Sequence, residues 1–220
     1  MSIDAPRLEA LATRLRDGQQ DRGSRLVVGI TGSPGSGKTT LARALVDHLN
    51  RTGSPGAAYL PMDGFHLASS TLNRLGRQDR KGALDTFDGW GFVALLRRLR
   101  SEVSHPVYAP SFVRTVDEGV AGEVAIEPQH SIVIVEGNYL LAEPEPWDGV
   151  KDLLDECWFV ATPAAVREVR LIERHTRHGR TVAAATAWAR DVDGANAVGI
   201  EASRARADLV IPGTWGAVSH

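Results

Sequence analysis

The sequence holds one short run whose residue types and spacing suit phosphate chemistry, GSPGSGKTT, which satisfies the pattern G-x-x-x-x-G-K-[ST]. Its glycines let the backbone curl so that successive N–H groups face one anion, beside the positive end of the helix that should follow. Lys38 would reach the terminal phosphates, and Thr39 would offer its hydroxyl to Mg²⁺. Because a strand-like run precedes it and an amphipathic stretch follows it, a chance glycine-rich turn is disfavoured, and the run predicts binding of a nucleoside triphosphate with Mg²⁺. The predicted nucleotide-binding residues are Gly32, Ser33, Pro34, Gly35, Ser36, Gly37, Lys38, Thr39 and Thr40.

Two carboxylates stand at the ends of apolar runs that are typical of buried strands. Asp63 ends the run YLPMD, and Glu136 ends the run SIVIVE. Ligands of open α/β sheets bind outside the carboxyl ends of the strands, so both acids should lie beside the phosphate loop. Asp63 could then take the proton from a hydroxyl that attacks the γ-phosphoryl group, and Glu136 with Thr39 could hold Mg²⁺ or one of its waters. The alternative roles are a turn cap for Asp63 and a helix cap or loop anchor for Glu136.

For other polar residues near Asp63, the sequence allows two roles and does not decide between them. His66 could contact a substrate, or it could pack and form hydrogen bonds within its loop. The basic cluster of Arg77, Arg80 and Lys81 could steer an anionic acceptor into a pocket, or it could form a solvated loop surface.

A basic stripe occurs later in the chain, where four arginines recur at spacings of three, four and three residues: Arg167, Arg170, Arg174 and Arg177. They should share one face of a helix that begins at Thr162 and Pro163, with the threonine as cap and the proline at the first helical position. Guanidinium groups match phosphate oxygens bidentately, as a lid over a transferring phosphoryl group requires. We therefore expect a lid region over 164–182, with a solvated basic face as the alternative.

These residues must be positioned by alternating strands and helices. Apolar, β-branched runs predict strands over 25–31, 57–62, 131–137, 157–160 and 207–211. Amphipathic spacing predicts helices over 1–22, from the phosphate loop to a turn at 53–56, and from near Asp88 onward. The segment 68–87 is polar and irregular, and we interpret it as a substrate loop. The pattern predicts an α/β P-loop NTPase fold in one domain, 1–220, with a doubly wound, mainly parallel sheet, helices on both faces and a helical lid.

Composition limits the class of protein. The 220 residues are 43% hydrophobic and 24% charged with a formal net charge of −2, which is typical of a globular protein without a global basic field for nucleic acid. The one cysteine, Cys157, excludes an intrachain disulfide and suits a reducing compartment. The polar amino terminus and the lack of an apolar run of roughly 18 residues argue against a signal peptide and a membrane span. We expect a cytoplasmic protein with a small-molecule partner and no nucleic-acid or membrane partner, and a homodimer is compatible with the sequence.

The phosphate loop, the strand-end Asp63 and the strand-end Glu136 with Gly137 occur in the order found in the uridine kinase, phosphoribulokinase and pantothenate kinase group, which the chain resembles over 25–211. The segments PMDGFHL, RKGALDTFD and VIVEGNYLL look most like bacterial nucleoside/nucleotide kinase-like proteins, including sugar-transport-associated kinases. The resemblance implies that Asp63 is the general base and that Arg170 and Arg174 meet the phosphates during transfer.

The same resemblance implies an acceptor pocket. Phe87-Asp88 matches an aromatic–acid pair whose acid holds substrate hydroxyls, and Tyr108 matches a pocket tyrosine. The predicted substrate-binding residues are therefore Asp63, His66, Asp88, Tyr108 and Asn138. However, Ala109 follows Tyr108 where uridine kinases usually have an acid, and Val113 stands where closer relatives commonly have one. Both changes remove polar contacts, so the identity of the acceptor does not carry over.

Together these features predict an ATP- and Mg²⁺-dependent kinase that transfers the γ-phosphoryl group to a hydroxyl of a nucleoside, a pantothenate-like compound or a sugar. Its predicted catalytic residues are Asp63, Lys38, Arg170 and Arg174. The alternative is a P-loop NTPase or switch protein that hydrolyses nucleotide without an acceptor, and a GTPase would also need an N-K-x-D segment, which the sequence lacks. A non-catalytic nucleotide sensor is disfavoured because Lys38, Asp63 and Glu136 are all present.

Overall fold

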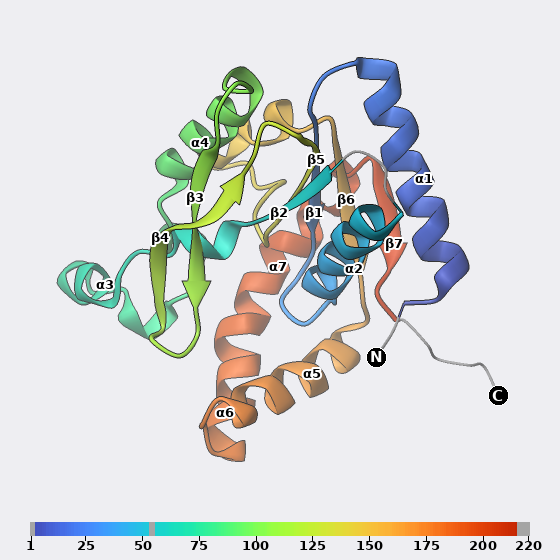
Figure 1. Cartoon of the computed structure of the whole chain (residues 1–220). Coiled ribbons are helices and arrows are strands. Elements are labelled where there is room, and N and C mark those ends of the chain that lie inside the picture. The colour runs from blue at the N-terminus through green and yellow to red at the C-terminus, as the bar shows by residue number, and fades with distance from the viewer. Residues whose placement is uncertain (1–2, 53–55, 215–220) are drawn as a thin grey trace.

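Five parallel strands form the central sheet, in the order β2-β5-β1-β6-β7. The structure is a computed structural model that describes residues 3–52 and 56–214 (Figure 1). The strands of this sheet are β1 (Leu26–Thr31), β2 (Gly56–Pro61), β5 (His130–Glu136), β6 (Glu156–Ala161) and β7 (Leu209–Pro212). The predicted doubly wound parallel sheet is confirmed, and β1, which leads into the phosphate loop, lies at its centre.

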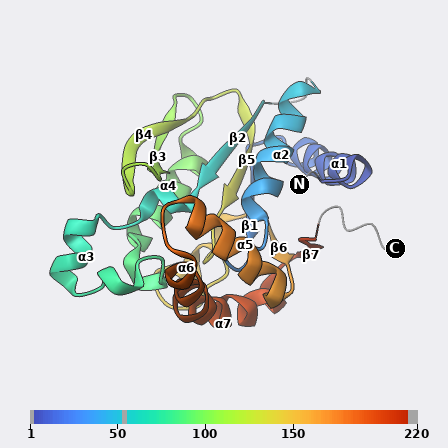
Figure 2. The same cartoon turned by 90° about the horizontal axis from the view of Figure 1, so that it is seen from below.

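Helices cover both faces of this sheet (Figures 1 and 2). They are α1 (Ala5–Arg22), α2 (Lys38–Arg51), α3 (Ser69–Leu75), α4 (Gly89–Ser101), α5 (Ala164–Arg177), α6 (Val182–Trp188) and α7 (Gly194–Ala202). Because side chains alternate along a strand, Val28 and Ile30 of β1 pack in one core with the apolar faces of α1 and α2. Val27 points to the opposite face and belongs to a second core, which includes α4 and Ile200 of α7.

Two helix ends differ from the expected boundaries. Pro163 is the N-cap of α5, so the predicted threonine cap is wrong by one residue. The hydroxyl of Thr162 instead donates a hydrogen bond of 2.8 Å to the carbonyl of Ser36, which ties the start of α5 to the phosphate loop. At the end of α2, Thr52 is the C-cap, and the predicted turn falls largely on 53–55, which lie outside the described residues.

The segment 68–87 is not irregular, contrary to the prediction. It contains α3 and two 3-10 turns, Gln78–Arg80 and Leu84–Thr86. Leu72 of α3 is buried, and Gly76 ends the helix in the left-handed conformation with φ of 64°. A helix of seven residues shows too little apolar periodicity to be recognised in a polar segment, because it spans only two turns.

An antiparallel hairpin of β3 (Val107–Val113) and β4 (Glu118–Ile126) was not predicted. Its inner residues Val107, Ala109 and Ile126 are fully buried in the same core as α4. Most of β4 is exposed, so the strand does not form an apolar run in the sequence. The hairpin lies beside the edge strand β2 of the main sheet (Figure 1), near the residues that follow that strand.

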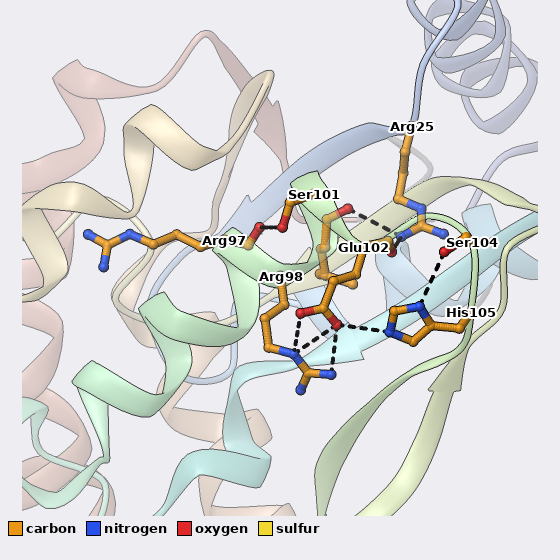
Figure 3. Close-up of polar contacts among 8 residues, drawn as sticks. Arg25, Arg97, Arg98, Ser101, Glu102, Ser104 and His105 are labelled. Atoms are coloured by element: carbon orange, nitrogen blue, oxygen red, sulfur yellow. Dashed lines mark hydrogen bonds and ion pairs between the residues drawn. The ribbon is translucent and has the colours of Figure 1, made fainter.

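A buried arginine fastens α4 to the sheet (Figure 3). Arg25 stands just before β1 and donates hydrogen bonds to four backbone carbonyls: Leu99 (3.2 Å), Glu102 (3.3 Å), Glu127 (3.1 Å) and His130 (3.0 Å). Two of these carbonyls lie at the carboxyl end of α4, where a helix leaves carbonyls without partners. The Glu102 side chain also pairs with Arg98 and His105, as Figure 3 shows.

A helical arm follows β6 and is formed by α5, α6 and α7, with a π-helical turn at Ala189–Asp193 (Figure 2). The expected helical lid region over 164–182 therefore corresponds to α5 and the start of α6. Within the part of the chain that the structure describes, no helix is both long enough and apolar enough to cross a membrane.

Candidate active site

Three strand ends meet at one edge of the sheet. The phosphate loop follows β1, Asp63 follows β2, and Glu136 is the last residue of β5. The strand register pairs Glu136 with Ile30 on one side and with Pro61 on the other. Since parallel strands end together, the loop and both acids are brought to the same place, as the sequence predicted.

The phosphate loop adopts a conformation that depends on its glycines. Gly35 and Gly37 have φ of 77° and 98°, in the left-handed region that other residues rarely adopt. A Cβ at Gly32 would lie 2.6 Å from the carbonyl oxygen of Val160, so the loop has no room for a side chain there. The Ser36 hydroxyl is buried and has no hydrogen-bond partner among the described residues. Together with the helix that begins at Lys38, the loop fits the terminal phosphates of a nucleotide.

Oxygen and cation groups suited to a magnesium phosphate lie beside the loop. The Thr39 hydroxyl donates a hydrogen bond of 3.0 Å to Glu136 Oε2, and Lys38 Nζ lies 3.6 Å from Glu136 Oε1. Tyr59 also donates to Glu136, at 2.8 Å, and its pKa is raised by burial and by the charge of that carboxylate. Within 3–52 and 56–214, no group of three or more His, Cys, Asp or Glu side chains could hold a metal alone. A hydroxyl and one carboxylate fit Mg²⁺, which keeps waters and phosphate oxygens as its other ligands.

Asp63 lies on a 3-10 turn, Met62–Phe65, that the hairpin covers. A Cβ at Gly64 would lie 2.2 Å from the carbonyl oxygen of Pro110, so only glycine allows the hairpin to pack this closely. The Asp63 side chain is 36% exposed, and its Oδ2 lies 3.9 Å from Nη2 of Arg114. Arg114 was not predicted as a site residue, because its place beside Asp63 depends on the unpredicted hairpin.

A polar cavity of about 400 Å³, called the main cavity below, opens beside Asp63. The phosphate loop contributes Pro34, Lys38 and Thr39 to its lining. Other lining residues come from the turn after β2, the segment 78–87, the hairpin and the helical arm, and include Asp63, His66, Lys81, Phe112, Arg114, Asn138, Arg174, His175, Asp193 and Asn196. The main cavity therefore joins the candidate phosphate site to a space where a second small molecule could lie.

His66 lines the main cavity and stands between two aromatic rings. Its ring stacks on Phe87, with 4.0 Å between centroids and 29° between planes, and lies 4.9 Å from Phe112. Its Nδ1 atom is buried, and no described residue forms a hydrogen bond with it. Burial lowers the pKa of His66, although Asp63 acts in the opposite direction. The imidazole is thus neutral near pH 7, and its ring lines the cavity while its Nδ1 atom is buried.

The predicted arginine stripe separates into different roles. Arg170 donates hydrogen bonds to the carbonyls of Gly35 (3.1 Å), Ser36 (3.3 Å) and Gly213 (3.1 Å), so it braces the phosphate loop and does not line the main cavity. Arg174, one turn further on, does line the cavity. Its Nε is buried without a hydrogen-bond partner in the described part of the chain, and burial lowers its pKa, although a guanidinium remains charged.

Two predicted substrate residues lie outside the main cavity. Asp88 is exposed and caps α4, where its carboxylate accepts a hydrogen bond of 2.8 Å from the Gly91 N–H. Tyr108 is 57% exposed on β3. From the same strand and the turn after it, Phe112 and Arg114 reach the cavity instead. The structure therefore does not bring these two side chains to the cavity, because one caps a helix and the other points outward from its strand.

Asn138 and Lys81 are two further polar residues that line the main cavity. The Asn138 side-chain oxygen is buried, and the described residues provide it with no donor. Lys81 Nζ lies 2.9 Å from Asp117 Oδ2 and 5.3 Å from the centre of the Phe112 ring. Of the basic cluster, only Lys81 lines the cavity, because Arg77 and Arg80 pair with Asp85.

A histidine–aspartate pair links two parts of the helical arm. This contact was not predicted from the sequence. His175 of α5 and Asp193 of the π-helical turn lie 2.7 Å apart, between Nε2 and Oδ2, and both line the main cavity. Sequence spacing gives no signal for such a contact, since 18 residues and a change of helix separate the two.

Comparisons with known proteins agree with this arrangement. The model of the phosphoribulokinase/uridine kinase family matches residues 27–215. A Schizosaccharomyces pombe protein provisionally named a uridine kinase is 33% identical over 190 residues, which are 81% of this chain and 79% of the relative. A uridine kinase from Leuconostoc citreum is 36% identical over 162 residues, 71% of this chain and 72% of the relative. A crystal structure from a Silicibacter species, of a protein provisionally named a fructose transport system kinase, is 38% identical with a TM-score of 0.82 and covers 91% of this chain and 98% of that chain.

Proposed function

The chain belongs to the phosphoribulokinase/uridine kinase family of nucleotide-binding P-loop kinases, and on this basis we propose that it transfers the γ-phosphoryl group of ATP to a hydroxyl of a small molecule. One observation carries the proposal. The carboxylate of Asp63 lines the same cavity as Lys38 and Thr39 of the phosphate loop, and that cavity of about 400 Å³ has room for an acceptor. A carboxylate at this point can receive the proton of an attacking hydroxyl.

The residues around the loop suit the stabilisation of phosphoryl charge. Mg²⁺, when bound, would neutralise charge on the β- and γ-phosphate oxygens. Thr39 and Glu136 would hold the ion or its waters, and Lys38 would contact the terminal phosphates. Arg174 would place its guanidinium at the transferring group from the opposite wall, while Arg170 keeps the loop in shape through the backbone carbonyls that it contacts.

Proton transfer is assigned to Asp63. In the loose transition state of phosphoryl transfer the hydroxyl loses its proton late, so a weak base is sufficient. The acceptor oxygen forms a bond to phosphorus, the bond to the ADP oxygen breaks, and the hydroxyl proton passes to the carboxylate. Positioning and electrostatic stabilisation supply most of the acceleration in such a site.

The lining of the cavity supports an acceptor with several polar groups. The neutral imidazole of His66, the side-chain oxygen of Asn138 and the ammonium group of Lys81 offer both donors and acceptors. The relatives named after uridine and fructose transport make a nucleoside and a sugar the first compounds to try, with pantothenate-like compounds next.

The proposal is tested by ADP formation from ATP and Mg²⁺ in the presence of nucleosides, sugars and pantothenate, one at a time. We expect turnover that depends strongly on one class of acceptor, with the phosphorylated product identified by mass spectrometry. Hydrolysis of ATP at the same rate with every acceptor and with none would contradict the proposal and would favour a nucleotide-hydrolysing switch. A Lys38→Ala variant controls for contaminating activity.

A further inference from the structure

A second cavity of about 410 Å³, called the side cavity below, adjoins the main cavity. Asn138 and Asn196 line both cavities, so the two spaces border each other at these residues. The wall on one side is the turn after β5, with Tyr139, Leu141 and Pro144, and the other wall belongs to α7. Unlike the main cavity, the side cavity is lined mostly by apolar residues, and nothing in phosphoryl transfer requires it.

The α7 wall contributes one large side chain, Ile200, and several small residues. Ala195, Gly199 and Ala202 are spaced four and three residues apart, so they share the face of the helix that lines the side cavity. A Cβ at Gly199 would have no atom within 4 Å, which means that the space in front of it is open. Glycine is less favourable than alanine inside a helix. Position 199 thus has room for a side chain but is occupied by glycine, which leaves that space empty.

An unsatisfied polar atom marks the junction of the two cavities. The side-chain oxygen of Asn138 is buried and finds no donor among the residues that the structure describes. The backbone carbonyl of the same residue accepts a hydrogen bond of 3.1 Å from the Thr31 hydroxyl, so the acceptor without a partner is the side-chain oxygen. A buried acceptor without a donor is unfavourable. Because Asn138 lines both cavities, a rotation of its side chain would turn this oxygen toward a ligand N–H or O–H at the junction.

We propose that the side cavity binds an apolar part of the phosphate acceptor. This inference rests on the proposed kinase function and narrows its substrate class. The acceptor is then an amphiphilic alcohol, with its reactive hydroxyl at Asp63, a hydrogen-bond donor at Asn138, and an aliphatic or aromatic group between α7 and the turn after β5. The two asparagines that line both cavities favour one molecule that reaches both.

The test uses a series of 2,3-dihydroxy-N-alkylpropanamides with methyl, butyl and hexyl chains, which combine hydroxyls, an amide N–H and an alkyl tail. Their affinities for the protein in the presence of ADP and Mg²⁺ are measured by isothermal titration calorimetry. Burial of each methylene group in the side cavity should strengthen binding roughly twofold to fourfold. In a Gly199→Leu variant the new side chain fills the side cavity, so the hexyl compound should bind no better than the methyl compound, whose affinity stays unchanged.

A matched control changes the neighbouring position. Val198 is 74% exposed and does not line the side cavity, so Val198→Leu should keep the full dependence on chain length. Circular dichroism checks that each variant folds, and Ala195→Leu replaces Gly199→Leu if the latter does not. The inference is overturned if no compound binds, if wild-type affinity does not change with chain length, or if the filled variant keeps the dependence. Failure of the proposed function is a different result, in which no acceptor stimulates ADP formation. The two results are distinguishable because calorimetry measures binding and requires no phosphoryl transfer.

Discussion

The guanidinium of Arg114 lies 3.9 Å from the carboxylate of Asp63, although one residue follows the hairpin strand β3 and the other follows β2 of the main sheet. Both side chains line the main cavity. A cation at this distance adds positive charge beside the carboxylate, where a phosphoryl group would pass. The hairpin is therefore part of the site, and its close packing on Gly64 is what brings the two residues together.

Replacing Arg174 and replacing Arg170 by alanine should impair different properties of the enzyme. Arg174→Ala should lower kcat roughly 10²- to 10³-fold with little change in ATP affinity, because its guanidinium faces the cavity and stabilises charge in the transition state. Arg170→Ala should weaken ATP binding and lower the thermal midpoint, since it contacts carbonyls of the phosphate loop. Steady-state kinetics and calorimetry with ADP separate the two effects. Arg177→Ala, an exposed change on the same helix, is the control, and equal losses in all three variants would contradict the assignment.

Glu136→Gln should impair the use of Mg²⁺. The substitution keeps the shape of the side chain but removes the charge beside Lys38 and Thr39. We expect the Mg²⁺ concentration that gives half-maximal activity to rise about tenfold to hundredfold. Activity is measured as a function of free Mg²⁺ at saturating ATP, with the exposed Glu173→Gln as control. If the activity curve of the variant coincides with that of the wild type, Glu136 takes no part in binding Mg²⁺.

His66 should make the stability of the fold depend on pH. Burial lowers the pKa of His66, so the unfolded chain binds its proton at a higher pH than the folded chain does. The free energy of unfolding should therefore be highest above the ordinary histidine pKa of about 6.5. It should fall as the pH decreases from that value through the lower pKa of the folded state. Urea unfolding at about pH 8 and about pH 5 should show a smaller difference for His66→Gln than for wild type. An identical difference in the two proteins would contradict the prediction.

Gly64→Ala should destabilise the protein, because a Cβ there would lie 2.2 Å from the carbonyl oxygen of Pro110. The hairpin or the 3-10 turn must shift, at a cost of about 1–3 kcal/mol in unfolding free energy. Gly149→Ala is the matched control, since its Cβ would meet no atom within 4 Å. Chemical denaturation measures both, and equal stability of the two variants would show that the close approach is not tight in solution.

The sheet and its reactive edge could be predicted from sequence because their signals are local and strong. β1 and β5 are continuous apolar runs, and the phosphate loop and Glu136 follow directly from where those runs end. The rule that parallel strands present their carboxyl ends together then placed Asp63 at the same edge.

The cavity walls could not be predicted in the same way. β3 contains Pro110, and most of β4 is exposed, so neither strand has a clear pattern, and Arg114 was missed with them. Helical spacing predicted the helix α5 but could not say which neighbours its arginines meet. Asp88 and Tyr108 were expected in the pocket by resemblance alone, and the chain here uses one as a helix cap and exposes the other.

The most direct test of phosphoryl transfer to a hydroxyl is turnover by Asp63→Asn with the acceptor that the screen identifies. The variant should bind ATP normally by calorimetry, while kcat falls roughly 10²- to 10⁴-fold because the proton of the hydroxyl has no carboxylate to receive it. Asp88→Asn serves as the control, since asparagine also caps helices and the residue lies outside the main cavity, and it should keep wild-type turnover. Unchanged turnover in Asp63→Asn would contradict the role of Asp63 as the base.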